Sequence, residues 1–82
     1  MNHTHINVTV DFSKWKGAIY DLRIPVHQPI KQLILNLAET LQLDLLQQTY
    51  FALKIPTKHL LLSDDDRLLD YPVSDGDILI VL

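Results

Sequence analysis

The sequence predicts a single α+β domain in which one helix packs across one face of a mixed β-sheet. The chain begins with two segments in which apolar and polar residues alternate, as they do in half-buried strands. One central segment has apolar residues at helical spacing, and three short apolar runs follow it. With 82 residues, 48% of them hydrophobic, the chain has enough apolar surface for one core. We therefore expect residues 1–82 to form one domain.

The first two elements are predicted to be a β-hairpin. Residues 5–12 alternate, with apolar side chains at every even position, and residues 18–24 resume the same pattern with Ile19 as a mild exception. The segment between them contains Gly17, which can adopt the positive φ of a short hairpin with a bulge. Pro25 then ends the second strand.

The helix is predicted over residues 29–42. Pro29 suits the first turn of a helix, because its missing N–H would have no partner there. Apolar side chains then recur every three or four residues, with polar ones on the opposite face. After a linking segment through Leu45 and Leu46, strands are predicted at residues 50–55, 60–62 and 78–82, the second of them a short edge strand.

The predicted order of elements is β-β-α-β-β-β, in which the first and last strands can pair in parallel. A long crossover that contains the helix separates these two strands, as parallel pairing requires. This is the β-grasp arrangement. We expect the core to consist of apolar residues from the helix and four of the strands: Ile6, Val8, Val10, Leu22, Ile30, Leu33, Leu37, Leu53, Leu79 and Val81.

Composition excludes several classes of function. The chain has no cysteine, which rules out disulfides, thiolate nucleophiles and cysteine-bound zinc. Its net charge is −3 and its seven basic residues are scattered, so we expect no nucleic-acid partner. The first residues lack the features of a signal peptide, and no apolar run reaches the roughly 20 residues that span a bilayer. We expect a cytoplasmic protein with no direct membrane insertion.

Several segments give a closer resemblance. The order of elements, together with residues 66–71 and 74–77, resembles ubiquitin-like domains across nearly the whole chain. Residues 10–12, 20–22, 29–34, 66–71 and 74–79 are similar to the small YukD/EsaB-type proteins encoded with type VII secretion systems of Gram-positive bacteria. Most of these residues are scaffold positions.

This resemblance implies a cytoplasmic accessory or regulatory component. Its expected partners are the protein subunits of a membrane secretion machine, namely the secretion ATPase or its partner subunits, which would hold it at the inner face of the membrane. The resemblance implies no catalytic residues, and we expect no cofactor. The sequence ends in Val81-Leu82 instead of a glycine pair, so we expect no conjugation. The alternatives are a truncated covalent modifier or sulfur carrier, a ubiquitin-like adaptor unrelated to secretion, and a small enzyme.

Trp15 belongs to a Trp-X-Gly sequence with three interpretations. The motif marks the helical-hairpin proteins that type VII systems export, but here it links two segments of strand periodicity. Trp15 is also an aromatic residue at a predicted hairpin tip between two lysines, which favours a protein contact. The third interpretation is that Trp15 folds back over the edge of the core.

The last strand predicts a protein-binding surface. If Leu79 and Val81 point inward, Ile80 and Leu82 point outward, where a half-buried strand would carry polar residues. We expect them to form an exposed apolar patch with residues of the hairpin loop and the third strand, beside Lys54: Trp15, Tyr50, Ala52, Ile80 and Leu82. Self-association as a homodimer through this patch is a variant. The alternative is that these strands are apolar on both faces because another part of the chain covers them.

Other chemical groups receive structural interpretations. His3 and His5 share a strand face at a spacing that can chelate a metal, but no third ligand is evident. Three consecutive aspartates at 64–66 lack the alternation of a calcium loop and are predicted to form a solvated turn. Tyr71 is expected to pack beneath the preceding loop, with its hydroxyl bonded to backbone. No arrangement suggests a catalytic triad, and no metal site is predicted.

Overall fold

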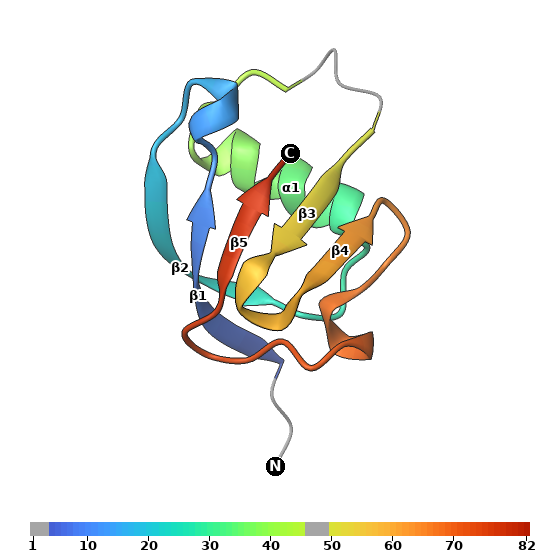
Figure 1. Cartoon of the computed structure of the whole chain (residues 1–82). Helices are drawn as coiled ribbons and strands as arrows, with labels where there is room; N and C mark the ends of the chain where they lie inside the picture. The colour runs from blue at the N-terminus through green and yellow to red at the C-terminus, as the bar shows by residue number, and fades with distance from the viewer. Residues whose placement is uncertain (1–3, 46–49) are drawn as a thin grey trace.

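The structure, a computed structural model, describes residues 4–45 and 50–82 (Figure 1). Its sheet has five strands in the order β2-β1-β5-β3-β4. One helix, α1 (Ile30–Thr40), lies across one face of this sheet. The strands are β1 (His5–Asp11), β2 (Ile19–Pro25), β3 (Ala52–Ile55), β4 (Leu60–Ser63) and β5 (Ile78–Val81). Three short 3-10 helices join them: η1 (Ser13–Trp15), η2 (Pro56–Lys58) and η3 (Leu68–Asp70).

The strand pairing confirms the predicted α+β arrangement. β1 pairs with β5 in parallel, and every other neighbouring pair in the sheet is antiparallel. The two terminal strands therefore occupy the middle of the sheet, and the edges are β2 and β4 (Figure 1). The predicted short edge strand at residues 60–62 is β4.

The core lies between α1 and the inner face of the sheet. Eight of the ten predicted core residues are buried, whereas Leu22 and Leu37 are only half-buried. The prediction was wrong for Leu22 because β2 is an edge strand, so one side of this side chain has no neighbouring strand. Larger side chains complete the core, since Phe12 and Phe51 are almost fully buried.

The start of α1 is hydrogen-bonded to the acidic turn at residues 64–66. The backbone N–H groups of Ile30 and Lys31 donate to the carbonyl oxygens of Asp66, at 2.8 Å, and Asp64, at 3.1 Å. These bonds satisfy donors that the first turn of a helix leaves unpaired. The helix ends two residues before the predicted limit, because Gln42 adopts a left-handed φ of 59° and the N–H of Leu43 bonds the carbonyl of Ala38.

The loop between β1 and β2 corrects the prediction for Gly17. The left-handed residue is Lys16, with φ 63°, and Gly17 does not have a positive φ. Position 17 requires glycine for a different reason, because the surrounding atoms leave no space for a side chain. A Cβ atom at position 17 would lie 2.8 Å from the Cβ of Phe12 and 3.2 Å from its carbonyl oxygen.

Substituting Gly17 by alanine is expected to lower the free energy of unfolding by about 1 to 3 kcal/mol, because the added methyl group collides with a fully buried phenylalanine and its backbone. Urea denaturation measures this loss. Lys16→Gly is the matched control, since glycine relieves the left-handed strain one residue earlier and should not destabilise the fold. Equal midpoints for Gly17→Ala and wild type would show that the loop has room that the structure does not show.

Tyr71 also departs from its prediction. Its hydroxyl donates to the carboxylate of Asp66, at 3.0 Å, and not to a backbone carbonyl. The second carboxylate oxygen of Asp66 accepts the N–H of Ser63, at 2.8 Å. The bond to Ser63 and the bond to Tyr71 hold the pKa of Asp66 below its ordinary value, and the same carboxylate raises the pKa of Tyr71.

Candidate functional site

The outer face of the sheet is the face opposite α1 (Figure 1). No helix or strand among residues 4–45 and 50–82 covers it. The interpretation that another part of the chain covers these strands therefore finds no support in the described elements. Ile80, on the central strand β5, is half-exposed on this face.

Cross-strand register places Ile80 at the middle of a row of side chains. Its partner on β1 is Asp11 and its partner on β3 is Lys54. Lys54 in turn faces Leu61 on β4, and Asp11 faces Ile19 on β2. The row ends in two exposed apolar residues, since Leu61 is 67% exposed and Ile19 is 63% exposed. An apolar residue at the centre of the sheet is thus flanked by one negative and one positive side chain.

Leu82 extends this surface toward the end of β5. Its N–H donates to the carbonyl oxygen of Ala52 at 3.0 Å, which places the two residues side by side. A shallow groove of about 660 Å³ brings Leu82 together with Lys54 and Leu61. The sheet-face patch, as defined by these contacts, comprises Ala52, Lys54, Leu61, Ile80 and Leu82.

Tyr50 and Trp15 are the other two residues that the sequence predicts at this surface, and they lie outside the sheet-face patch as defined above. Tyr50 is 77% exposed and lies just before β3, two residues from Ala52. Trp15 lies in η1 and packs its half-buried ring against the core. With Lys14 and Lys16 it lines a groove at the C-terminal end of α1, which Leu43 and Asp44 complete. The Trp-X-Gly sequence therefore joins two strands of a hairpin.

Leu61 and Ile19 are surface residues that sequence reasoning missed. Residues 60–62 are three consecutive leucines, so the sequence shows no alternation from which to choose a face. The antiparallel register with β3 decides it, because Leu62 pairs with buried Leu53 and Leu61 pairs with exposed Lys54. The sequence did indicate that Ile19 is unusual, since it is an apolar residue at an outward position of an otherwise regular alternation.

Asp77 fixes the start of β5. It is only 5% exposed, and its carboxylate accepts the hydroxyl of Thr57 at 2.8 Å and the N–H of Ser74 at 2.9 Å. Lys58 lies 3.6 Å from the same carboxylate. Burial raises the pKa of Asp77, but these hydrogen bonds and the charge of Lys58 outweigh it, so that the pKa lies below its ordinary value of 3.8.

Asp77→Asn is expected to make stability less dependent on acid pH. Because the pKa of Asp77 is lower in the folded chain than in the unfolded one, its contribution is complete above the ordinary value of 3.8 and is lost as pH falls through the folded value. At neutral pH the substitution should cost about 1 to 3 kcal/mol, since it removes the charge and one acceptor. Urea denaturation at neutral and acid pH measures both effects.

Asp65→Asn is the control for this prediction, because Asp65 is exposed. Some pH dependence should remain in Asp77→Asn, since hydrogen bonds from Ser13 lower the pKa of Asp11 and the pKa of Asp66 is also lowered. A pH profile of Asp77→Asn that parallels wild type would contradict the role given to the buried carboxylate.

The sequence offers two groups of candidate metal ligands, the histidines at positions 3 and 5 and the three aspartates at 64–66. His3 lies outside the described residues, and His5 is on the outer face of β1 next to the hydroxyl of Thr4. The carboxylate of Asp64 accepts the N–H of Phe51, so the protein's own donors occupy the carboxylates of Asp64 and Asp66. Within the described part of the chain, no three histidine or acidic side chains are grouped as metal ligands.

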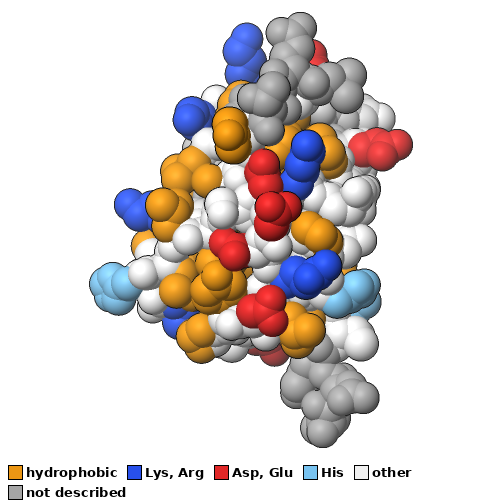
Figure 2. Space-filling model, turned by 90° about the vertical axis from the view of Figure 1, so that its right-hand side faces the viewer, with side chains coloured by type: hydrophobic (Ala, Val, Ile, Leu, Met, Phe, Trp, Pro, Cys, Tyr) orange, Lys and Arg blue, Asp and Glu red, His pale blue; other side chains and the backbone are white. Residues whose placement is uncertain are grey.

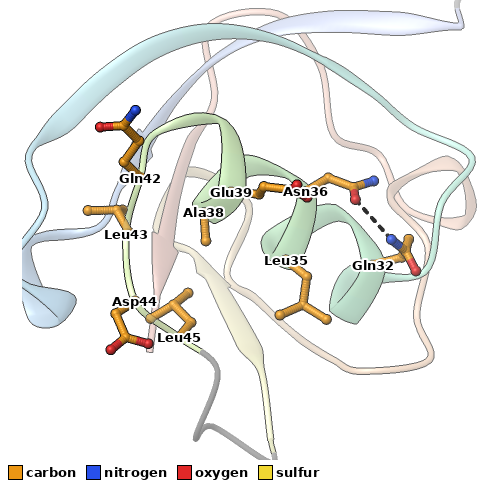
Figure 3. Close-up of a pocket in the computed structure, with 9 residues that line it drawn as sticks. All are labelled: Gln32, Leu35, Asn36, Ala38, Glu39, Gln42, Leu43, Asp44 and Leu45. Atoms are coloured by element: carbon orange, nitrogen blue, oxygen red, sulfur yellow. Dashed lines mark hydrogen bonds between the residues drawn. The ribbon is translucent and has the colours of Figure 1, made fainter.

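A third groove lies between α1 and residues 42–45 (Figure 3). Its volume is about 620 Å³, and Leu35, Leu43 and Leu45 give it apolar walls. Gln32 donates to Asn36 at 2.9 Å along its rim. The described residues that line it include amides and two carboxylates but no nucleophile beside a base. The geometry gives this groove no catalytic chemistry.

Surface charge is mixed on the side of the molecule where β4 lies. Figure 2 shows acidic, basic and apolar side chains interspersed on that side, with no large region of one sign. No described helix is long and apolar enough to cross a membrane.

Comparison with known proteins identifies the family. A sequence model of the family described as "WXG100 protein secretion system (Wss), protein YukD" matches residues 5–81, which include every strand and the helix. The chain belongs to the YukD family. The resemblance drawn from residues 10–12, 20–22, 29–34, 66–71 and 74–79 is thereby confirmed.

Relatives of this YukD family protein agree in length and sequence. It is 40% identical over 78 residues to proteins described as "Type VII secretion system accessory factor EsaB" from Staphylococcus aureus strains Newman and COL. These alignments cover 95% of the chain and 96% of each relative.

A solved structure supports the fold. The structure described as "Molecular Mimicry of SUMO promotes DNA repair" matches with a TM-score of 0.76 and 21% identity, over 100% of this chain and 95% of that one. The predicted ubiquitin-like β-grasp fold is confirmed.

Proposed function

We propose that this YukD family protein is a non-catalytic accessory component of a type VII secretion system and that it acts by binding other subunits. The names of its Staphylococcus aureus relatives support the accessory role. The observation that carries the binding mechanism is the sheet-face patch, in which half-exposed Ile80 lies at the centre of the outer face, which no helix or strand of the described residues covers. Exposed apolar residues in this position are typical of protein-binding surfaces.

The chemistry of the described side chains supports a binding role over a catalytic one. The patch offers apolar side chains and one lysine, which suit a contact of mixed apolar and polar character. The buried carboxylate of Asp77 is held by two hydrogen bonds and an ion pair, and therefore serves the structure of the β5 loop. The expected partners are the secretion ATPase or its partner subunits, which would bring this protein to the inner face of the membrane.

Affinity purification tests this function. The tagged protein, crosslinked with formaldehyde in cells that express the secretion genes, should bring down one or more named subunits of the secretion machine. An unrelated tagged ubiquitin-like protein serves as control. Recovery of no secretion subunit, in cells whose secretion depends on the tagged protein, would overturn the proposal.

A further inference from the structure

The free edge of β2 is an unused site for strand pairing. β2 has seven residues and pairs only with β1, while no described element pairs with its other edge. The opposite edge of the sheet, β4, is much better protected, because it has four residues between a left-handed His59 and the acidic turn. Proteins usually shorten, bend or charge their edge strands to prevent pairing. β2 is long and regular, and only its end carries a proline, Pro25. It has two exposed charged residues, but Asp21 and Arg23 are of opposite sign and so do not necessarily repel a second copy of the strand.

The hydrogen bonds of the hairpin show which backbone groups are available. At one end of the β1–β2 ladder the N–H of Phe12 donates to the carbonyl oxygen of Ala18, and at the other end the N–H of Val26 donates to the carbonyl oxygen of Thr4. In an antiparallel pair, successive residues point their N–H and C=O groups alternately toward and away from the partner strand. The even-numbered residues of β2 therefore direct theirs toward β1. The odd-numbered residues Ile19, Asp21 and Arg23 therefore direct theirs toward solvent.

The exposed side chains of this edge are self-complementary. Asp21 and Arg23 are both exposed, two residues apart on the outer face. One oxygen of Asp21 accepts the hydroxyl of Thr9 at 2.8 Å, and among the described residues the guanidinium of Arg23 has no hydrogen bond or ion pair. In an antiparallel pair with a second copy, a two-fold axis at Leu22 sets Asp21 of each chain opposite Arg23 of the other. This register also matches the free N–H and C=O groups of both residues.

We propose that the chain forms a homodimer by antiparallel pairing of β2 with β2 of a second copy, with the two-fold axis at Leu22. The two sheets then join into one continuous sheet. The neighbouring register, with its axis at Asp21, is disfavoured because it sets two aspartates directly opposite each other. Charge complementarity therefore selects one register.

The inner face of the same strand supports this pairing. Tyr20 and Leu22 are only half-buried, although their positions in the alternation direct them to the core side. In the proposed dimer Leu22 faces its own copy at the axis, and Tyr20 faces Ile24 of the other chain. Cross-strand apolar pairs of this kind stabilise sheets. The pairing would thus cover the side of Leu22 that the monomer leaves open.

Charge exchange tests the register directly. Sedimentation velocity of the wild-type protein should show a dimer that dissociates on dilution. Asp21→Arg and Arg23→Asp should each weaken dimerisation about tenfold or more, since each replaces two attractive cross-strand pairs by two repulsive ones. The double variant with both changes restores opposite charges and should dimerise again. An equimolar mixture of the two single variants should form the heterodimer.

Two controls show whether the charge changes act at the β2 edge itself. Asp65→Arg makes the same charge change at an exposed site outside β2 and should leave dimerisation unchanged. Thermal unfolding of Asp21→Arg checks that loss of the Thr9 bond has not unfolded the chain. The proposal is overturned if the wild type is monomeric at millimolar concentration, or if the double variant is folded but does not dimerise. It is also overturned if Ile80→Asp dissociates the dimer while both single charge variants leave it intact.

Discussion

Leu33→Ala is expected to lower the free energy of unfolding by about 2 to 5 kcal/mol. Leu33 is 1% exposed on the face of α1 that packs on the sheet, so alanine would leave a cavity in the middle of the core. Domains of this size are stable by roughly 5 to 15 kcal/mol in total, so the variant would lose a large share. Urea denaturation followed by circular dichroism measures the loss.

Leu35→Ala is the matched control for this experiment. It makes the same chemical change on the same helix, but Leu35 is half-exposed and lines the groove beside residues 42–45. Its loss should be clearly smaller, because much of the removed surface is already in contact with water. If Leu35→Ala cost as much as Leu33→Ala, the helix would not present the face that the structure gives it.

Ile80→Asp is expected to abolish capture of secretion subunits while the protein stays folded. A residue at the centre of an interface commonly contributes about 2 kcal/mol or more, so affinity should fall about 30-fold or further. The fold should tolerate the change because Ile80 is half-exposed, and because repulsion from Asp11 is offset by attraction to Lys54 on its other side. Affinity purification and the thermal midpoint measure the two effects.

Leu69→Asp is the control for the binding experiment. Leu69 is 62% exposed in η3, outside the sheet, and receives the same kind of substitution. It should capture subunits as well as the wild type does. Unfolding of Ile80→Asp would show that Ile80 belongs to the core, in which case Ile80→Ala provides the milder test. Equal capture by folded Ile80→Asp and wild type would contradict the role of the sheet-face patch.

Periodicity was sufficient to predict most of the fold. The alternation in residues 5–12 and 18–24 and the helical spacing after Pro29 correspond to β1, β2 and α1. The parallel pairing of β1 with β5 followed from the length of the crossover. The three elements could be predicted because each has one buried face, and the order of apolar residues records directly which face is buried.

Details that depend on packing between distant segments could not be predicted. Gly17 was correctly placed in the loop between the first two strands, but glycine is required there because of Phe12, whose side chain fills the space where a Cβ would lie. Tyr71 bonds a carboxylate that the acidic turn brings within reach, and the sequence does not show where that turn directs Asp66. Leu22 is half-buried because β2 is an edge strand, which is a property of strand order.

The candidate surface was predicted in part. Ile80 and Leu82 were assigned to the outer face because they alternate with Leu79 and Val81, and the structure places them there beside Lys54 and Ala52. Trp15 lies in η1 against the core, because the 3-10 turn after β1 directs it toward the end of α1. Leu61 was missed because a run of three leucines has no periodicity to interpret.

Site-specific crosslinking in living cells is the sharpest test of a partner on the outer face of the sheet. A photoreactive amino acid at position 80 should form a crosslink to a subunit of the secretion machine, and the same amino acid at position 69 should not. Position 15 indicates whether the contact reaches the loop between β1 and β2. Crosslinks to secretion subunits from position 69 but not from position 80 would contradict the proposed binding surface.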